Sequence, residues 1–268
     1  MKNDFDETRS GTGTHEWAEI NENIARGCPH RCLYCYAAHN ANRFGLRTRS
    51  EWPIEELTKR AVITSYPERS GVIMFPSAHD ITPFNLNAYI RVARLILEAG
   101  NRLLIVSKPH TECIAKLIME LASFKEQILF RFTIGTTLDP VSKFWEPGAP
   151  RPAERIAALN LAYQAGYRTS VSAEPLLGGL ETAVAVLDAV RPYVTDTVWI
   201  GKLNKARSRV DMTVSVNAEK VAGLETLQSD LEVLRMYRAL HADPLIRWKD
   251  SIKTVIARFG GQPLAQVA

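Results

Sequence analysis

Short apolar runs alternate along the chain with longer stretches in which apolar residues recur every three or four positions. The runs are rich in Val, Ile, Leu or Phe, as expected for strands of a buried parallel sheet. They are Trp17–Asn21, Gly71–Pro76, Arg102–Val106, Ile128–Ile134, Arg168–Ala173 and Thr197–Ile200. The intervening periodicity predicts helices. These cover Leu86–Ala99, Thr111–Ser123, Pro152–Ala165, Glu181–Val190 and Asp230–His241.

Proline and glycine support these boundaries. Pro152 suits the first turn of a helix, and Gly166 suits the cap that ends the same helix. The spacing of the runs fits about six βα units, because parallel strands need helical crossovers. We therefore predict an α/β fold that forms an open or partial barrel. One domain is expected over residues 16–260, with a polar N-terminal tail (1–15) and a C-terminal tail (261–268).

Composition restricts the class of protein. Of the 268 residues, 46% are hydrophobic and 23% are charged, which is typical of a globular protein. No apolar run approaches the roughly 18 residues that a membrane span needs. The first 17 residues are polar and lack the apolar segment of a signal peptide. We expect a cytoplasmic protein with no membrane partner.

The predicted sheet indicates where ligands bind. In parallel α/β folds they bind at the carboxyl ends of the strands, on the loops that follow. These loops are Ser77–Pro83, Ser107–Pro109, Thr136–Pro140, Glu174–Gly179 and Gly201–Arg209. A cluster of cysteines follows the first predicted strand and is expected at the same mouth.

Three of the four cysteines, Cys28, Cys32 and Cys35, fall within eight residues. Without an export signal, such clustering favours metal or redox chemistry over disulfides. Their C-x3-C-x2-C spacing can hold three irons of a four-iron cluster and leave one iron open. A zinc site completed by His30 or His39 is the alternative, although the chain has no second cysteine pair. Cys113 stands alone in a predicted helix and is expected to be a buried apolar residue.

Basic residues form two clusters without acidic neighbours. The formal net charge is only +4, but residues 23–50 contain no Asp or Glu. The clusters comprise Arg26, Arg31, Arg43, Arg47 and Arg49, and then Lys202, Lys205, Arg207 and Arg209. They suit a polyanionic partner such as nucleic acid, or are simply solvated loops.

The cysteine segment GCPHRCLYCY, with Tyr34 before the last cysteine, resembles the signature of radical SAM enzymes. The resemblance implies a partial (β/α)6 TIM-type barrel and a [4Fe-4S] cluster held by the three cysteines. It also implies S-adenosylmethionine at the open iron and a one-electron reductant of the flavodoxin or ferredoxin type. Reductive cleavage would yield a 5′-deoxyadenosyl radical that abstracts hydrogen from a substrate.

Further segments resemble the spore photoproduct lyase-related group, which is also called DNA repair photolyase-like. They are SAHDITPF, LLIVSKP and the discontinuous TIGTTLD…EPGAPRPAERIAAL…AGYRTSVSAEPLLGGL. The lyase carries a hydrogen-donating cysteine just before the serine that matches Ser77. This chain has Phe75 and Pro76 there. Repair by that route is therefore not expected, and Tyr36 is a candidate hydrogen relay or a packing residue.

The same resemblance implies a set of cofactor-binding residues. They are Tyr34, Ser77, Lys108, Thr133 and Ala173. Lys108 offers a cation to a carboxylate. The alternatives are turn formation for Ser77, a solvated loop for Lys108 and sheet packing for Thr133.

Polar residues outside the signature are also expected at the mouth. Asp80 follows Ser77 in a turn, and Glu146 and Arg155 flank a proline-rich loop where they can pair. Glu174 ends an apolar strand, where a carboxylate needs a partner. We assign Glu174 a catalytic or cofactor role, with a structural ion pair as the alternative.

Three functions follow from these features. The first is a radical SAM enzyme that acts on nucleic acid. The second is a radical SAM enzyme that acts on a small molecule or a peptide. The third is a non-catalytic module that binds zinc or an iron–sulfur cluster.

Overall fold

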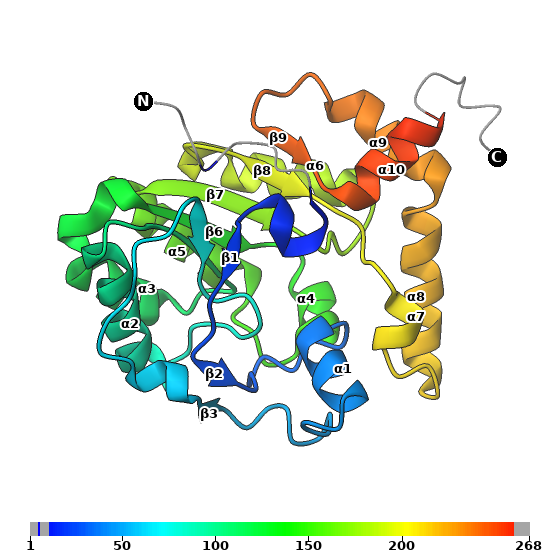
Figure 1. Ribbon diagram of the computed structural model, residues 1–268. Coiled ribbons are helices and arrows are strands. Elements are labelled where there is room, and N and C mark those ends of the chain that lie inside the picture. Colours follow the sequence, from blue (N-terminus) through cyan, green and yellow to red (C-terminus); the bar gives the residue numbers. More distant parts are fainter. Residues whose placement is uncertain (1–4, 6–10, 260–268) are drawn as a thin grey trace.

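A curled parallel sheet forms the centre of the molecule (Figure 1). The computed structural model describes Phe5 and residues 11–259. Seven strands lie in the order β1-β4-β5-β6-β7-β8-β9, and every neighbouring pair is parallel. They are β1 (Ile20–Asn21), β4 (Val72–Met74), β5 (Arg102–Ser107), β6 (Ile128–Thr133), β7 (Arg168–Ala173), β8 (Val198–Ile200) and β9 (Ile246–Trp248). A parallel sheet places the carboxyl ends of all seven strands at one mouth.

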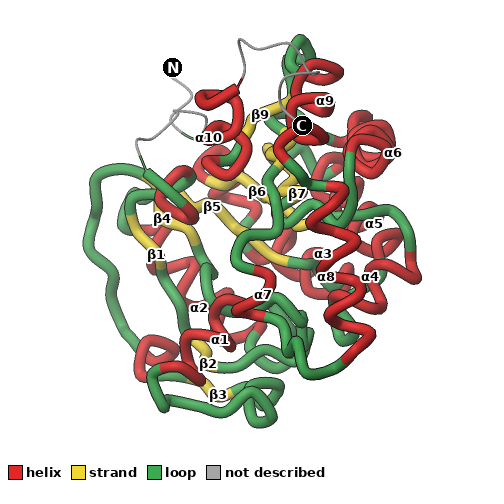
Figure 2. Tube along the Cα trace, turned by 90° about the vertical axis from the view of Figure 1, so that its right-hand side faces the viewer, coloured by secondary structure: helices red, strands yellow, loops and turns green. Residues whose placement is uncertain are grey.

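Helices connect the strands, as the tube in Figure 2 shows. Those that pack on the outer face of the sheet are α2 (Leu86–Glu98), α3 (Thr111–Glu120), α5 (Pro152–Gln164), α6 (Leu180–Val190), α9 (Asp230–Leu240) and α10 (Asp250–Phe259). The remaining α-helices are α1 (Tyr36–Arg43), α4 (Asp139–Trp145), α7 (Ala206–Arg209) and α8 (Ser215–Leu227). Short 3-10 helices are η1 (Gly13–Glu16), η2 (Lys59–Val62), η3 (Ala122–Gln127) and η4 (Arg191–Tyr193). Strands β2 (Ala25–Arg26) and β3 (Glu56–Leu57) form a small antiparallel pair.

Side chains along each strand alternate between the two faces of the sheet. The apolar residues therefore form one core beneath the helices and another inside the half-barrel. On β6, Phe130 and Phe132 face the helices, while Leu129 joins the inner cluster. The ring of Phe130 lies 5.2 Å from that of Tyr167 in an edge-to-face contact. Trp17, from the segment before β1, packs at 5.9 Å from the Trp199 ring inside the half-barrel. The inner face is therefore partly apolar and leaves room for a pocket nearer the mouth.

The predicted α/β partial barrel is confirmed, but the strand number of six is wrong. The seventh strand, Ile246–Trp248, has three residues including a charged arginine, so it gives little apolar signal. The first strand begins at Ile20 rather than Trp17, because η1 and a turn precede it. The other predicted strands and helices agree with the structure to within about three residues at each end.

The predicted domain boundaries stay a prediction. The C-terminal tail (261–268) lies outside the described residues, as does most of the N-terminal tail (1–15). In the described part of that tail, Phe5 is buried and Gly13–Glu16 forms η1. No helix in the described part of the chain is long and apolar enough to cross a membrane.

Candidate functional site

A pocket of ≈ 440 Å³ opens at the carboxyl mouth of the sheet. This volume lies within the roughly 300–1,000 Å³ of small-molecule sites. Nine of the ten predicted site residues line it: Cys28, Cys32, Tyr34, Cys35, Tyr36, Ser77, Lys108, Thr133 and Glu174. Ala173 does not, because its side chain alternates to the opposite face of β7 and packs in the main core. Its predicted role in binding the cofactor stays a prediction.

The loop of the three cysteines is anchored on both sides. At Gly27 the φ angle is 92°, and a Cβ there would lie 2.1 Å from the carbonyl oxygen of Ile54. On the other side, the amide of Leu33 donates to the Trp145 carbonyl at 2.9 Å. The amide of Gly148 donates to the His30 carbonyl, also at 2.9 Å. The connection between α4 and α5 thus holds the cysteine loop at the mouth.

The three thiols are largely surrounded by protein, and both positively and negatively charged side chains lie near them. Burial raises the pKa of Cys32 to about 12, and the Lys108 ammonium partly opposes this. Burial also raises the pKa of Cys28 and of Cys35. The sulfur of Cys35 accepts a hydrogen bond from the Ala38 amide at 3.4 Å, at the start of α1. Metal binding must remove these protons, and the Lys108 cation and the helix amide both favour the thiolates.

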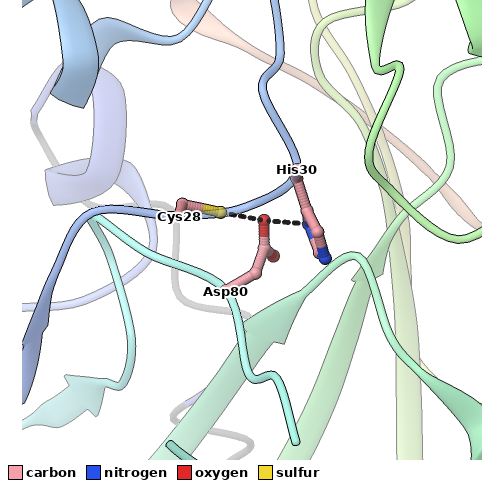
Figure 3. A group of neighbouring side chains, drawn as sticks. All are labelled: Cys28, His30 and Asp80. Carbon is pink, nitrogen blue, oxygen red and sulfur yellow. Dashed lines mark hydrogen bonds and ion pairs between the residues drawn. The ribbon is translucent and has the colours of Figure 1, made fainter. Parts of the chain in front are cut away.

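Asp80 connects the cysteine loop to the sheet. Its Oδ2 atom lies 2.8 Å from Nδ1 of His30 and 3.7 Å from Sγ of Cys28 (Figure 3). Its Oδ1 atom accepts hydrogen bonds from the Lys108 amide at 2.6 Å and the Ser107 hydroxyl at 3.0 Å. Burial opposes ionisation of this carboxyl, but Lys108 and His30 outweigh it and hold the pKa of Asp80 well below its usual range. Asp80 therefore lies at the mouth, as predicted. Its carboxylate connects the cysteine loop to the end of β5.

A second buried network lies beside it. The predicted pair of Glu146 and Arg155 is confirmed, and each side chain is 1% exposed. Glu146 also accepts a hydrogen bond from the Tyr34 hydroxyl and lies 4.0 Å from the Lys108 ammonium. Although burial opposes it, Arg155 and then Lys108 lower the pKa of Glu146. Tyr34 and Lys108 are thus fixed by this network, and Lys108 is not a solvated loop lysine.

Ser77 and Tyr36 meet at the edge of the pocket. The Tyr36 hydroxyl donates to the Ser77 carbonyl, and the guanidinium of Arg209 lies 6.0 Å from the centre of the Tyr36 ring. The side chain of Asn23 fixes Ser77, because its amide donates to the Ser77 hydroxyl at 2.8 Å and its oxygen accepts from the Ser77 amide at 3.0 Å. Sequence analysis missed Asn23, which carries no signal apart from its place after the first strand.

Glu174 lines the pocket on the inner face of the half-barrel and has an ion-pair partner. The Lys249 ammonium lies 3.4 Å from its Oε2 atom, and Lys249 itself is fully buried. Burial raises the pKa of Glu174 to about 7, and Lys249 partly opposes the shift. Sequence analysis missed Lys249, since it follows the short strand β9 that gave no apolar signal. The alternative reading of Glu174, a structural ion pair, is confirmed. Its catalytic or cofactor role stays a prediction.

The predicted basic residues divide into two groups. Some already serve the fold: Arg47 donates to the Ile54 carbonyl, Arg49 donates to the Arg209 carbonyl, and Arg207 pairs with Glu225. Others line the pocket: Arg31, Lys202 and Arg209. Fewer basic side chains are therefore available to bind a ligand than the sequence indicated.

One group of metal-ligand side chains occurs among the described residues. Cys28, His30 and Asp80 place their ligand atoms within 4.8 Å of one another. The three cysteine sulfurs are not all within that distance. His30 is already hydrogen-bonded, through Nδ1 to Asp80 and through Nε2 to His110 at 3.1 Å.

We predict that Gly148→Ala displaces the cysteine loop. A Cβ at this position would lie 2.2 Å from the Pro29 carbonyl oxygen and 3.1 Å from the His30 backbone. The variant should remain folded, lose about 1–3 kcal/mol of stability and bind several-fold less iron on reconstitution. Iron content and denaturant unfolding measure the two effects.

Gly223→Ala is the matched control. Gly223 lies on the exposed side of α8, and a Cβ there meets no atom within 4 Å. This change should leave iron content unaltered and stabilise the helix by roughly 0.5–1 kcal/mol. Equal iron content in both variants would contradict the role assigned to Gly148.

We also predict that Glu174 makes stability depend on pH. Its pKa rises from 4.5 to about 7 on folding, so between these values the native state holds a proton that the unfolded state has lost. The free energy of unfolding should therefore fall by on the order of 2–3 kcal/mol as pH rises from 4.5 to 7, and then level off. Urea unfolding at several pH values should show a flatter dependence for Glu174→Gln. The exposed Glu181→Gln should keep the wild-type slope, and identical slopes in all three proteins would exclude the effect.

Comparison with known proteins places this arrangement among characterised folds. No family model matches the chain. The uncharacterized protein ORF301 of Acidianus two-tailed virus is 27% identical over 169 residues, which cover 58% of this chain and 54% of the viral protein. The chain therefore spans about half the length of this curated relative.

Among solved structures, spore photoproduct lyase complexed with dinucleoside spore photoproduct is similar, with a TM-score of 0.55 and 15% identity. That superposition covers 95% of this chain and 77% of the lyase. A mutant of the lyase with the same dinucleoside gives a TM-score of 0.51 at 17% identity and covers 75% of this chain and 59% of the mutant. At these identities the likeness concerns the fold alone, and this chain and spore photoproduct lyase share a partial α/β barrel.

Proposed function

We propose that the protein is a radical SAM enzyme that binds a [4Fe-4S] cluster through Cys28, Cys32 and Cys35. The observation that carries this proposal is the convergence of the three thiols on one pocket at the mouth of a partial barrel. The spacing of the cysteines and the fold are independent features, and both suit the same chemistry. A one-electron reductant of the flavodoxin or ferredoxin type would be its partner.

The thiol geometry favours a cluster over a single zinc ion. A tetrahedral zinc site needs its ligand atoms close around one centre. The three sulfurs do not all lie within 4.8 Å of one another, and their spacing along the chain suits a polynuclear cluster, which is larger than one ion. A single ion at Cys28, His30 and Asp80 would have to break the His30–Asp80 contact of 2.8 Å and use one cysteine only. The zinc-binding module therefore remains the alternative function, with less support.

The other pocket residues suit S-adenosylmethionine. The Lys108 side chain is 12% exposed and would bind the carboxylate of the methionine group. Ser77 and Thr133 present hydroxyl-bearing side chains to the same pocket. When bound together, the cluster and S-adenosylmethionine supply a carbon-centred radical that takes hydrogen from a substrate. The chain's own residues would hold these ligands in the pocket.

We assign Tyr36 to the substrate side of the pocket. Its ring is 38% exposed, and its hydroxyl is hydrogen-bonded to the Ser77 carbonyl. The side chain thus lines the pocket and is also exposed to solvent, which supports a role as a hydrogen relay to a substrate. The residue before Ser77 is Pro76, so no thiol is available at that position.

A nucleic acid is the substrate that the charges favour. Arg31 comes from the cysteine loop, while Lys202 and Arg209 come from the segment after β8, and all three line the pocket. The two acidic groups of the pocket, Asp80 and Glu174, are paired with His30 and Lys249. Lys202 lies 3.8 Å from Asp230. The positive charge of Arg31 and Arg209 therefore suits a phosphate-bearing ligand. A small molecule or peptide is the alternative substrate.

We predict that replacing Cys28, Cys32 or Cys35 by alanine abolishes cluster assembly. Anaerobically reconstituted wild-type protein should hold roughly four irons per chain and convert S-adenosylmethionine to 5′-deoxyadenosine when reduced. Each variant should lose both properties, because three thiolates are the minimum set of ligands. Iron analysis and chromatography of the nucleoside measure the outcome.

Cys113→Ala is the control for these variants. Cys113 is fully buried in the main core and should affect neither measurement. The proposal fails if a triple Cys28, Cys32 and Cys35 variant keeps full iron and cleavage. It fails equally if the wild-type protein is colourless and holds one zinc ion per chain.

We predict salt-sensitive binding to single-stranded DNA or RNA. When a protein binds phosphates, the logarithm of the binding constant falls linearly with the logarithm of the salt concentration. The slope is about 0.7 per phosphate contact for a single strand. Arg31→Gln and Arg209→Gln should each reduce the slope by about one such contact, while Arg207→Gln, whose side chain is paired with Glu225, should change it little. Fluorescence anisotropy over a salt series gives these slopes. Absent or salt-insensitive binding would favour the small-molecule or peptide substrate.

A further inference from the structure

Trp52 lies next to the loop of the three cysteines. Its carbonyl oxygen accepts a hydrogen bond from the Cys28 amide at 2.9 Å, and its own amide donates to the Thr48 carbonyl at 3.1 Å. The residue is 6% exposed, and it lines the pocket at the mouth of the sheet. The backbone therefore holds this tryptophan beside the first cysteine of the loop.

The segment that carries Trp52 has little freedom to move away from the cysteines. Arg47 donates to the Ile54 carbonyl at 2.8 Å and to the Arg26 carbonyl at 3.2 Å. Its guanidinium thus joins the two chain segments on either side of the contact. Gly27 allows their close approach, because a Cβ there would lie 2.8 Å from the Trp52 carbonyl oxygen.

The indole N–H of Trp52 is a buried donor that lacks an acceptor. Its Nε1 atom is buried, and among the described residues no atom accepts a hydrogen bond from it. Buried polar groups are nearly always paired, and an unpaired one costs free energy unless a ligand or water satisfies it. Because an indole nitrogen only donates, the missing partner must be an acceptor.

The side chains around Trp52 offer sulfur as an acceptor. Trp52 forms a small buried cluster with Cys28 and three alanines of α1, and Cys35 and Ala78 pack against this cluster. Alanine side chains cannot accept hydrogen bonds, whereas sulfur can. Within this group of described residues, the sulfurs of Cys28 and Cys35 are therefore the only side-chain acceptors beside the indole.

A donor at this place affects the reduction of a bound cluster. The reduction potential of an iron–sulfur cluster depends on its net charge and on hydrogen bonds to its sulfurs. Reduction adds one negative charge, and a hydrogen bond to a charged acceptor is stronger than one to a neutral acceptor. The indole N–H therefore favours the reduced state. The Asp80 carboxylate, 3.7 Å from the Cys28 sulfur, acts in the opposite direction.

We propose that the indole N–H of Trp52 donates a hydrogen bond to a sulfur of the bound [4Fe-4S] cluster, on its Cys28 side, and raises the reduction potential of that cluster. The inference rests on the proposed function, because it requires the cluster. It adds a residue outside the cysteine motif that contacts the cluster and makes its one-electron reduction easier.

The first test is a redox titration of the reconstituted protein, followed by electron paramagnetic resonance without S-adenosylmethionine. Trp52→Phe keeps an aromatic ring but removes the N–H. Its one-electron reduction should be about tenfold less favourable, which is a midpoint potential about 59 mV more negative. Trp248→Phe is the matched control, because Trp248 packs against the outer core and does not line the pocket. This control should keep the wild-type potential.

The second test detects the contact itself. Pulsed electron paramagnetic resonance of reduced protein, made with tryptophan labelled with ¹⁵N in the indole, should show a nitrogen coupling to the cluster. The coupling should be present in the wild type and in Trp248→Phe, and absent in Trp52→Phe. Trp17 also lines the pocket, so Trp17→Phe should keep the coupling. If Trp52→Phe does not fold, the wild-type and Trp17→Phe spectra still decide the question.

The inference is overturned if the wild type lacks the coupling, or if the coupling persists in Trp52→Phe or disappears in Trp17→Phe. It is also overturned if Trp52→Phe titrates at the wild-type potential. Iron content and cleavage of S-adenosylmethionine are measured on the same samples. A four-iron protein that cleaves S-adenosylmethionine without these effects would reject the role of Trp52 alone. A protein that assembles no cluster would reject the proposed function and, with it, this inference.

Discussion

The partly buried carboxylate of Asp80 joins the two parts of the mouth that must meet for a site to exist. Its one oxygen contacts Cys28 and His30 of the cysteine loop, and its other oxygen accepts hydrogen bonds from Ser107 and Lys108 at the end of β5. Because the strands are parallel, all their carboxyl ends already lie at one edge. Asp80 then fixes the loop against that edge, and the thiols, Lys108 and the Glu146 network surround one pocket as a consequence.

Much of the fold was predictable because buried parallel strands are apolar on both faces. Strand β7 was predicted with its observed bounds for this reason, and β5 and β6 nearly so. Strand β9 was missed because it is short and contains Arg247, and its stability depends on pairing with β8. Helix α1 was not predicted. Its first turn is capped by the sulfur of Cys35, which accepts a hydrogen bond from the Ala38 amide.

The candidate site was predictable where a local pattern carries the chemistry. Cysteine spacing and the strand ends located most of the pocket, including Lys108 and Glu174. Asn23 and Lys249 were missed because their contacts with Ser77 and Glu174 join distant parts of the chain. The same cause explains the arginines: Arg49 and Arg207 look free in the sequence but bind a distant carbonyl and a distant carboxylate.

The central claim is that the three thiols hold a cluster with one iron open to S-adenosylmethionine. Electron paramagnetic resonance of the reconstituted, reduced protein tests it most directly, with spectra recorded before and after S-adenosylmethionine is added. The account predicts the signal of a reduced [4Fe-4S] cluster that changes on addition, because the cofactor binds the open iron. A cluster signal that does not respond to S-adenosylmethionine, or no cluster signal at all, would contradict the account.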